Sequence, residues 1–259
     1  MAEARDGVQS VVRALSLLRL IAQGDGGTRL SDLARAAGLP VSTAHRLLTT
    51  LEQQGFAQFE PAGAVWHVGR EAFSAGMAYG RKLSFVAPAL PLLRRLRDLT
   101  RETANLGILD DDHLITLSQV ESREIRRALS PPGRRVPVFS SAMGKAILST
   151  WRDDDILALA ARAGLPPLTS KSLRTPQAVL DDIALTRRRG WALDDEEFGI
   201  GLRCLAAVVW SPQGEAACAI SISGAAARLT DVRLDAMGAR VAQAAADLTA
   251  LLGGAPPPD

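Results

Sequence analysis

The sequence predicts an α+β protein of two parts, in which three helices and a β-hairpin precede a larger unit of helices and an antiparallel sheet. Three observations lead to this prediction. Apolar residues first recur with the 3.6-residue period of a helix and later alternate over short runs, as in strands. Turn residues such as Asp110-Asp111-Asp112 separate these runs. The chain has 259 residues, of which 47% are apolar, and this is enough for packed cores.

The first helix is predicted from an apolar stripe near the N-terminus. Positions i, i+3, i+4 and i+7 of the stripe are Val8, Val11, Val12 and Leu15, and Leu18 and Ile21 continue it. The glycine-rich stretch Gly24-Asp25-Gly26-Gly27 is a loop signal and ends the helix.

A second, shorter helix and a tight turn follow. The helix is marked by the apolar residues Leu30, Leu33, Ala34 and Ala37. Gly38 suits its end, where a left-handed backbone is needed. Pro40 is tolerated in the first turn of the next helix, because its missing N–H would have no partner there. This pattern is typical of a helix-turn-helix.

The third helix has two faces of different chemistry. At about 100° per residue, one face collects the apolar residues Ala44, Leu47, Leu48 and Leu51, which pack on the first two helices. The opposite face collects Ser42, Arg46, Thr49 and Gln53, with Thr43, His45 and Thr50 beside them. These hydroxyl, imidazole, guanidinium and amide groups suit the phosphates and base edges of DNA.

A polar helix face is often no more than a solvated surface. Solvated faces usually carry Glu and Lys, whereas this face has neither before Glu52 at its edge. Strands at 56–60 and 65–68 flank a turn, so the three helices are followed by a hairpin. Residues 1–68 are therefore predicted to form a winged helix-turn-helix that binds DNA. The predicted DNA contacts are Arg29, Ser42, Thr43, His45, Arg46 and Thr49.

The rest of the chain alternates helices with short strands. Residues 69–86 are predicted to be a linker containing a helix over 70–83, and residues 87–253 an α+β domain. Further helices are predicted at 89–101, 142–149, 153–163, 176–189 and 230–252. Strands are predicted at 105–109, 113–117, 125–129, 191–193, 203–210 and 215–223. The Pro-rich tail, 254–259, is predicted to be disordered.

Composition argues against several classes of protein. The two cysteines, Cys204 and Cys218, give no disulfide framework, and no apolar run could act as a signal core or membrane span. A cytoplasmic protein with no membrane partner is expected. The chain has no Cys-x-x-Cys, His-Glu-x-x-His or phosphate loop, so no catalytic residue, metal or cofactor is predicted. Without an assigned base nearby, Cys204 is expected to be a small core residue rather than a nucleophile.

Four stretches of the chain follow the order of a known family. They read VQSVVRALSLLRLIA, LSDLARAAGLPVSTAHRLLTTLEQQGF, SAMGKAILS, and DDEEFGIGLRCLAAVV followed by AISISG and ARLT. In these stretches the chain resembles the IclR family of bacterial transcriptional regulators. The resemblance implies a GAF-like effector domain and a homo-oligomer, either a dimer or a dimer of dimers. The implied partner is a near-palindromic, double-stranded operator, on which two-fold symmetry doubles the bases read.

Two features depart from the family pattern. Val41 stands where a basic residue is common, and Val65 and His67 flank Trp66 where arginines are common. Over residues 1–80, seven arginines balance seven acidic residues. We therefore expect few ion pairs with phosphate, and an affinity for DNA that depends on direct contacts and on dimer avidity.

The resemblance also implies a pocket for a small organic acid. Backbone amides of Ala142, Met143 and Gly144 match the family's anion-binding positions at a helix start. The other matching positions are Asp194, Leu202, Cys204, Ser221 and Ser223. We infer that Asp194 accepts a hydrogen bond from the ligand or from a nearby N–H, and we expect Lys145 to be exposed beyond the pocket.

Strand alternation supports part of this set. It puts Leu202 and Cys204 on one face, and it puts Ser221 and Ser223 together. From alternation alone, serines bonded to nearby backbone or water remain the simpler interpretation.

The predicted function is a ligand-responsive regulator of a catabolic operon, in which the effector changes how two DNA-binding domains are held. Close matches at LRCLAA and AISISG favour a small 2-oxo acid, such as glyoxylate or pyruvate. Two alternatives stay open: an aromatic acid as the effector, and a second domain that only oligomerises. The sequence does not specify whether the effector releases or strengthens DNA binding.

Overall fold

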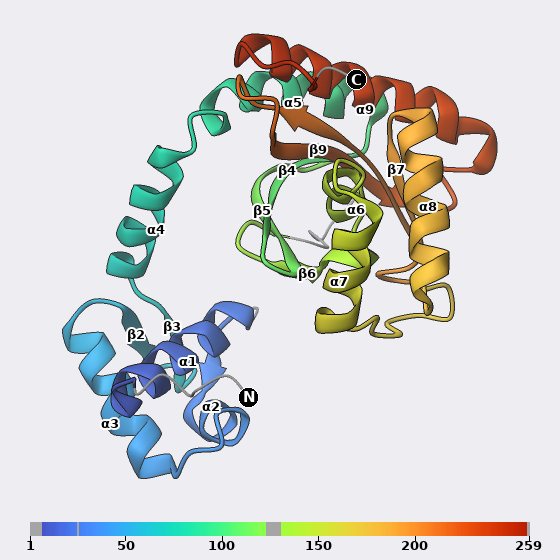
Figure 1. Ribbon diagram of the computed structural model, residues 1–259. Helices are drawn as coiled ribbons and strands as arrows, with labels where there is room; N and C mark the ends of the chain where they lie inside the picture. Colours follow the sequence, from blue (N-terminus) through green and yellow to red (C-terminus); the bar gives the residue numbers. More distant parts are fainter. Residues whose placement is uncertain (1–6, 25, 123–130, 258–259) are drawn as a thin grey trace. The chain divides into compact units, whose positions relative to one another are not determined.

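The computed structural model describes residues 7–24, 26–122 and 131–257 (Figure 1). Contacts between residues divide the chain into two units, Met1–Leu83 and Ser84–Asp259. The helix predicted as a linker, α4 (Arg70–Lys82), groups with the first unit. The finer division into 1–68, 69–86, 87–253 and 254–259 stays a prediction.

The first unit contains three packed helices and a small sheet. The helices are α1 (Gln9–Gln23), α2 (Leu30–Ala36) and α3 (Val41–Gln53). The sheet has the strand order β1 (Thr28–Arg29), β3 (Val65–Val68) and β2 (Ala57–Glu60), and all pairs are antiparallel. The winged helix-turn-helix is confirmed, with a short strand before α2 that the sequence pattern did not indicate.

The predicted faces of α3 are confirmed. Ala44 and Leu48 are fully buried against Leu17 and Ile21 of α1 and Leu33 of α2. The turn before α3 has the expected backbone, because Gly38 has a φ of +63°. Pro40 lies one residue earlier than predicted, as the residue that precedes the helix.

Most of the apolar stripe that predicts α1 faces away from this core. Its first four residues are about half exposed or more: Val8 68%, Val11 53%, Val12 51% and Leu15 47%. The core takes Leu17, which lies outside that stripe, and Ile21, the last residue of the stripe, and both are buried. Helix α1 therefore carries two apolar faces, and only one of them is covered within the chain.

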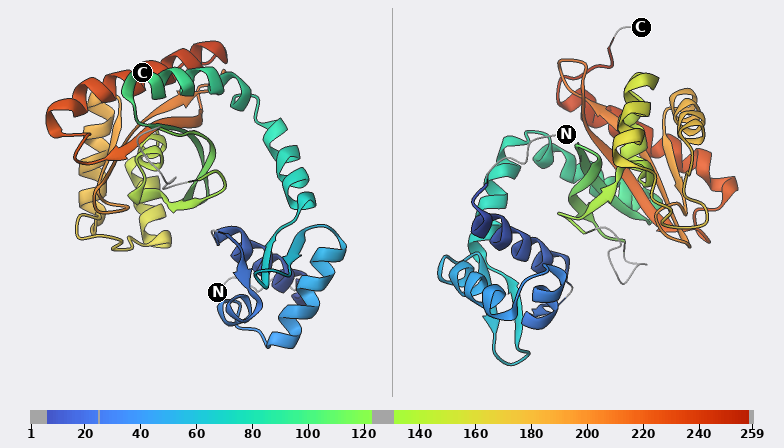
Figure 2. Two further views of the ribbon diagram at one scale, coloured as in Figure 1. Left: turned by 180° about the vertical axis from the view of Figure 1, so that it is seen from behind. Right: turned by 60° about the horizontal axis from the view of Figure 1, so that its bottom comes forward.

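The second unit is built on a six-stranded antiparallel sheet. Its order is β6 (Arg135–Pro137), β5 (His113–Val120), β4 (Thr103–Asp110), β9 (Ala216–Ala225), β8 (Leu202–Trp210) and β7 (Ala192–Asp195). Helices α5 (Val86–Thr100) and α9 (Asp231–Leu251) lie side by side on one face (Figures 1 and 2). The other face holds the 3-10 turn Val138–Ser140 and α6 (Ala142–Leu148), with α8 (Pro176–Arg189) and α7 (Asp153–Ala163) beyond. The predicted α+β class is confirmed.

Some boundaries differ from the sequence prediction. Helix α5 begins at Val86 instead of Ala89, so that Pro88 lies in its first turn and Pro91 inside it. Strand β6 was not predicted, and the strand predicted at 125–129 lies outside the described residues. Residues 254–257 follow α9 without regular structure, and disorder of the tail stays a prediction.

Strand register lines up side chains from distant parts of the sequence. One row of directly opposite residues, the Ser223 row, consists of Asp194, Cys204, Ser223 and Thr103. The next row on the same face, the Ser221 row, consists of Ala192, Ala206, Ser221, Asn105 and Gln119. Because opposite residues of antiparallel strands point to the same face, both rows face α6.

The packing of α9 on the sheet unit gives a testable prediction at Gly238. A Cβ added there would lie 2.3 Å from Cε2 of Trp191. Helix propensity alone favours Ala over Gly by about 1 kcal/mol, but overpacking costs ~1–3 kcal/mol. We expect Gly238→Ala to lower the free energy of unfolding, measured by urea denaturation. Ala239→Gly, at an exposed neighbouring position, is the control and should cost about 1 kcal/mol. A stabilised Gly238→Ala protein would contradict this packing.

Candidate functional site

The outer face of α3 in the first unit is polar and accessible. Ser42, His45 and Arg46 are exposed, and Thr43 and Thr49 are partly exposed. All of these except Ser42 line a hollow that is completed by Leu47, Thr50 and Gln53 of α3 and Ser10 of α1. The structure thus brings five of the six predicted DNA contacts together on one helix, while Arg29 lies apart from them on β1. Among the described residues, Arg46 has no carboxylate partner, so its guanidinium is available to phosphate or guanine.

A small cavity lies under the serine rows of the second unit. Its volume is about 40 Å³. It is lined by seven of the eight predicted effector residues, namely Ala142, Met143, Asp194, Leu202, Cys204, Ser221 and Ser223. It is also lined by residues that were not predicted, Asn105, Leu114, Val136, Ser140, Ser141 and Phe198.

Gly144 is the predicted residue that does not line the cavity. Its N–H donates to the Oγ of Ser141, the residue that caps α6, at 3.3 Å. A Cβ at this position would lie 2.3 Å from the carbonyl oxygen of Val138. Gly144 is therefore explained by the close approach of α6 to the preceding turn.

Asp194 lies almost fully buried at the wall of this cavity. One carboxylate oxygen, Oδ1, accepts hydrogen bonds from the backbone N–H of Glu197 at 2.8 Å and of Phe198 at 3.3 Å. Burial raises the pKa of Asp194 to about 7, against the opposing charge of Lys145 and together with the repulsion from Glu197. The expectation of a nearby N–H donor is confirmed, and the carboxyl group can hold a proton near neutral pH.

Burial, followed by the neighbouring charge of Asp194, raises the pKa of the Cys204 thiol well above its ordinary value. A thiol that stays protonated is a poor nucleophile. Cys204 and Cys218 are both free cysteines.

The expectation that Lys145 is exposed is wrong. Its side chain is fully buried, and Nζ lies 2.6 Å from Oε1 of Glu197 and 3.0 Å from Oδ2 of Asp182. Burial acts to lower the pKa of Lys145, but the two carboxylates outweigh it and raise the pKa above the ordinary value. The ammonium group is therefore charged and ties α6 to α8 and to the loop after β7.

The serines are held by a side-chain amide that the sequence did not point to. Nδ2 of Asn105 donates to Oγ of Ser221 at 3.2 Å and to Oγ of Ser223 at 3.1 Å. Nε2 of Gln119 donates in turn to Oδ1 of Asn105 at 2.8 Å. A polar residue within the apolar run 105–109 was the only available signal, because its partners come from a distant strand.

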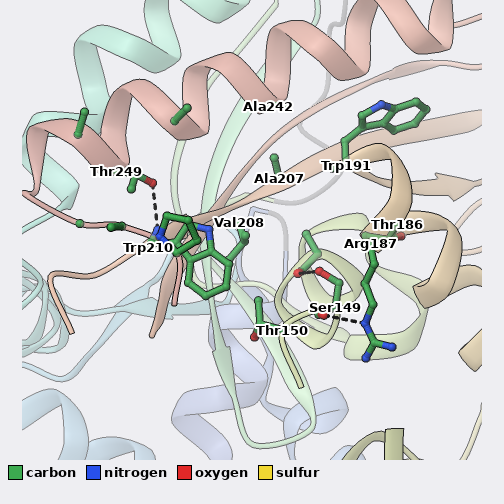
Figure 3. Close-up of a pocket in the computed structure, with 17 residues that line it drawn as sticks. Ser149, Thr150, Thr186, Arg187, Trp191, Ala207, Val208, Trp210, Ala242 and Thr249 are labelled. Atoms are coloured by element: carbon green, nitrogen blue, oxygen red, sulfur yellow. Dashed lines mark hydrogen bonds between the residues drawn. The ribbon is translucent and has the colours of Figure 1, made fainter. Parts of the chain in front are cut away.

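A larger groove of about 590 Å³ lies between α6, α8, β8 and α9 (Figure 3). It forms where β7 ends and leaves the last residues of β8 without a neighbour on that side. Three of its hydroxyls bond the protein's own backbone: Ser149 and Thr150 donate to the carbonyls of Ala146 and Ile147, and Thr249 accepts from the N–H of Trp210. Among the described residues, the buried hydroxyl of Thr186 has no partner. Arg187 donates to the carbonyls of Ser149 and Trp151. The smaller cavity, with hydroxyls, a thiol and a protonatable carboxyl, is the better candidate site.

The described residues contain no group of three or more His, Cys, Asp or Glu able to hold a metal ion. Over the same residues, no helix is both long and apolar enough to span a bilayer.

The pKa of Asp194 leads to a prediction about pH. Between its ordinary pKa of 3.8 and its folded pKa of about 7, only the folded state holds the proton. Folding stability is therefore lost as pH rises through this window and levels off above it. Relative to Asp194→Asn, the wild type should lose roughly 2–3 kcal/mol of unfolding free energy between about pH 5 and pH 8.

The measurement is urea denaturation of both proteins at several pH values. Asp235→Asn, on an exposed position of α9, is the control for the loss of one carboxylate. Parallel profiles for wild type and Asp194→Asn would mean that burial does not hold the proton.

Both units of the chain match domain models of one known protein family. Residues 10–61 match the IclR helix-turn-helix domain, and residues 77–250 match the bacterial transcriptional regulator IclR C-terminal domain. The acetate operon repressor of Salmonella typhimurium is 41% identical over 249 residues, covering 95% of this chain and 91% of that protein. The HTH-type transcriptional regulator BhcR of Paracoccus denitrificans is 42% identical over 248 residues, covering 96% and 88%.

A solved structure extends the agreement to three dimensions. A transcriptional regulator from Rhodococcus sp. RHA1 superposes with a TM-score of 0.79 at 27% identity, covering 95% of this chain and 98% of that one. The regulator assignment, in place of an enzyme, follows from these matches. The chain belongs to the IclR family of bacterial transcriptional regulators.

Proposed function

We propose that this protein represses a catabolic operon and that its effector is a 2-oxo acid of two or three carbons, such as glyoxylate or pyruvate. The observation that supports it most is the small polar cavity under the serine rows, in a chain of this family. Repression is proposed because the Salmonella relative is named a repressor.

The α3 face supports operator recognition by direct contacts. Hydroxyls of Ser42, Thr43 and Thr49 can bond phosphate oxygens, and Arg46 can bond both acceptors of a guanine in the major groove. His45 lies among them on the same exposed surface. We propose these residues, with Arg29, as the DNA contacts.

The chemistry of the cavity suits a small acid. The hydroxyls of Ser221 and Ser223 line it together with the thiol of Cys204, and the amides of Ala142 and Met143 begin α6 beside it. Asp194 is compatible with an anion because its pKa of about 7 lets it hold a proton beside the ligand.

The size of the cavity argues against an aromatic effector. A volume of about 40 Å³ holds roughly three water-sized groups, so side chains have to move even for glyoxylate, with its five non-hydrogen atoms, and have to move much further for an aromatic acid. A cavity that admits a benzene ring is on the order of 150 Å³. Met143 fills part of the space, and Gly107 leaves room for it, since a Cβ there would lie 3.1 Å from the Met143 sulfur.

We further propose that two chains pair through the uncovered apolar faces of the first unit. On α1 these are Val11, Val12 and Leu15, together with Val8 just before the helix, and on α4 they are Phe73 at 69% and Met77 at 48% exposure. Adjacent exposed apolar residues at helical spacing are typical of an interface. A pair of chains related by a two-fold axis matches the symmetry of a near-palindromic operator, so each DNA-binding unit can contact one half-site.

The effector proposal is tested by thermal unfolding with added acids. Glyoxylate or pyruvate at about a hundredfold excess over Kd should stabilise the wild type by about 2.7 kcal/mol. Ser221→Ala and Cys204→Ala should lose most of this stabilisation, because each removes a group that lines the cavity. Ser149→Ala, in the larger groove, is the control and should keep it. Stabilisation by benzoate alone would favour the aromatic alternative, and none by any acid would favour a second domain that only oligomerises.

The pairing proposal is tested by the mass of the protein in solution. Val12→Glu combined with Leu15→Glu should convert a dimer into a monomer that remains folded, because both side chains are exposed in the single chain. Leu185→Glu, at an exposed position of α8, is the matched control. Sedimentation equilibrium distinguishes the masses, and a double variant that still dimerises would rule out the α1 face.

A further inference from the structure

A chain of side-chain hydrogen bonds crosses three neighbouring strands at the effector cavity. Gln119 of β5 lies directly opposite Asn105 of β4, which lies directly opposite Ser221 of β9. Asn105 is 3% exposed and lines the cavity, so its amide lies at the site itself. The bond lengths of 2.8, 3.2 and 3.1 Å are those of ordinary hydrogen bonds.

The order of donors and acceptors gives this chain a direction. Gln119 donates to Oδ1 of Asn105, so the oxygen end of the Asn105 amide is turned toward β5. The nitrogen end is turned toward β9, and its two hydrogens go to Ser221 and Ser223. An amide nitrogen has only two hydrogens, so its donor capacity is fully used.

Each serine oxygen therefore accepts a hydrogen bond and keeps its own O–H proton for another partner. Among the described residues, neither serine hydroxyl donates to a protein acceptor. Both serines line the cavity, so a ligand there meets two O–H donors. Reversing both amides would make the serines donate to Asn105 and would turn their lone pairs toward the ligand.

We propose that Asn105 and Gln119 are positioning residues that fix the polarity of the effector cavity. They turn both serine hydroxyls into donors, so the site accepts a carboxylate or keto oxygen and discriminates against a ligand that offers N–H groups. This inference rests on the proposed function, because it concerns the same cavity. It adds that Asn105, oriented by Gln119, sets the specificity through its hydrogen bonds to the serines whose hydroxyls touch the effector.

The sharpest test is to reverse the direction of the hydrogen bonds between Gln119, Asn105 and the serines. In Gln119→Glu the new carboxylate accepts but cannot donate, so it should draw the Asn105 nitrogen toward β5 and turn Oδ1 toward the serines. Asn105→Asp should likewise accept hydrogen bonds from both serine hydroxyls. Gln119→Leu is the matched control. Its side chain neither donates nor accepts and adds no charge, so the hydrogen bond to Asn105 is lost but not reversed.

The probes are pyruvate and its uncharged amide, pyruvamide, titrated calorimetrically into the full-length proteins. The wild type should prefer pyruvate. Gln119→Glu and Asn105→Asp should bind pyruvate at least tenfold more weakly and bind pyruvamide more tightly than the wild type does. Gln119→Leu should weaken pyruvate binding by a smaller factor without improving pyruvamide binding. Thermal unfolding of each variant without ligand verifies that it is folded.

The pyruvamide measurement separates polarity from charge. A new carboxylate alone would repel pyruvate but leave pyruvamide unchanged, and this result would overturn the proposal. Unchanged affinities in both reversed variants would also overturn it, while the proposed effector class would stand. If the wild type binds neither probe and no other small acid, the effector class and this inference both fail.

Discussion

The second unit depends most on the ion pairs that the buried ammonium group of Lys145 forms with Asp182 and Glu197. This group joins α6 to α8 through Asp182 and to the loop after β7 through Glu197. A charge buried without a partner is very costly, and removing one member of such a pair costs about 3–5 kcal/mol. Because Lys145 follows directly after Ala142, Met143 and Gly144, the pairs also fix the start of α6 over the sheet.

The chemistry of the cavity follows from this anchor and from strand register. Glu197, held by Lys145, donates its backbone N–H to Asp194 and so orients that carboxyl group. Register then places Cys204 and Ser223 beside Asp194 in one row. A buried carboxyl group with one oxygen bonded, two hydroxyls and a thiol meet in a space of about 40 Å³. No single element could assemble this set, since it draws on strands from both halves of the sheet.

The local features of this fold could be predicted from the sequence, and the long-range ones could not. Helical period gave both faces of α3, and alternation put Ser221 beside Ser223, because both signals depend on neighbours in sequence. The exposure of Lys145 was predicted wrongly because its partners come from other elements. The role of Asn105 could not be predicted, because strand register decides which residues lie opposite it. The apolar stripe of α1 predicts a helix, but it does not show whether residues of the same chain or of another chain cover that stripe.

The alignment of the two rows has a consequence for how such a protein can evolve. Ala192 and Ala206 stand in the Ser221 row on the face that holds the cavity, and they carry only methyl groups. Side chains on paired strands can be exchanged one at a time while the backbone ladder stays intact. On the proposed function, a few substitutions in these rows can thus change which effector the regulator binds, while the operator-reading unit and the genes it controls stay unchanged.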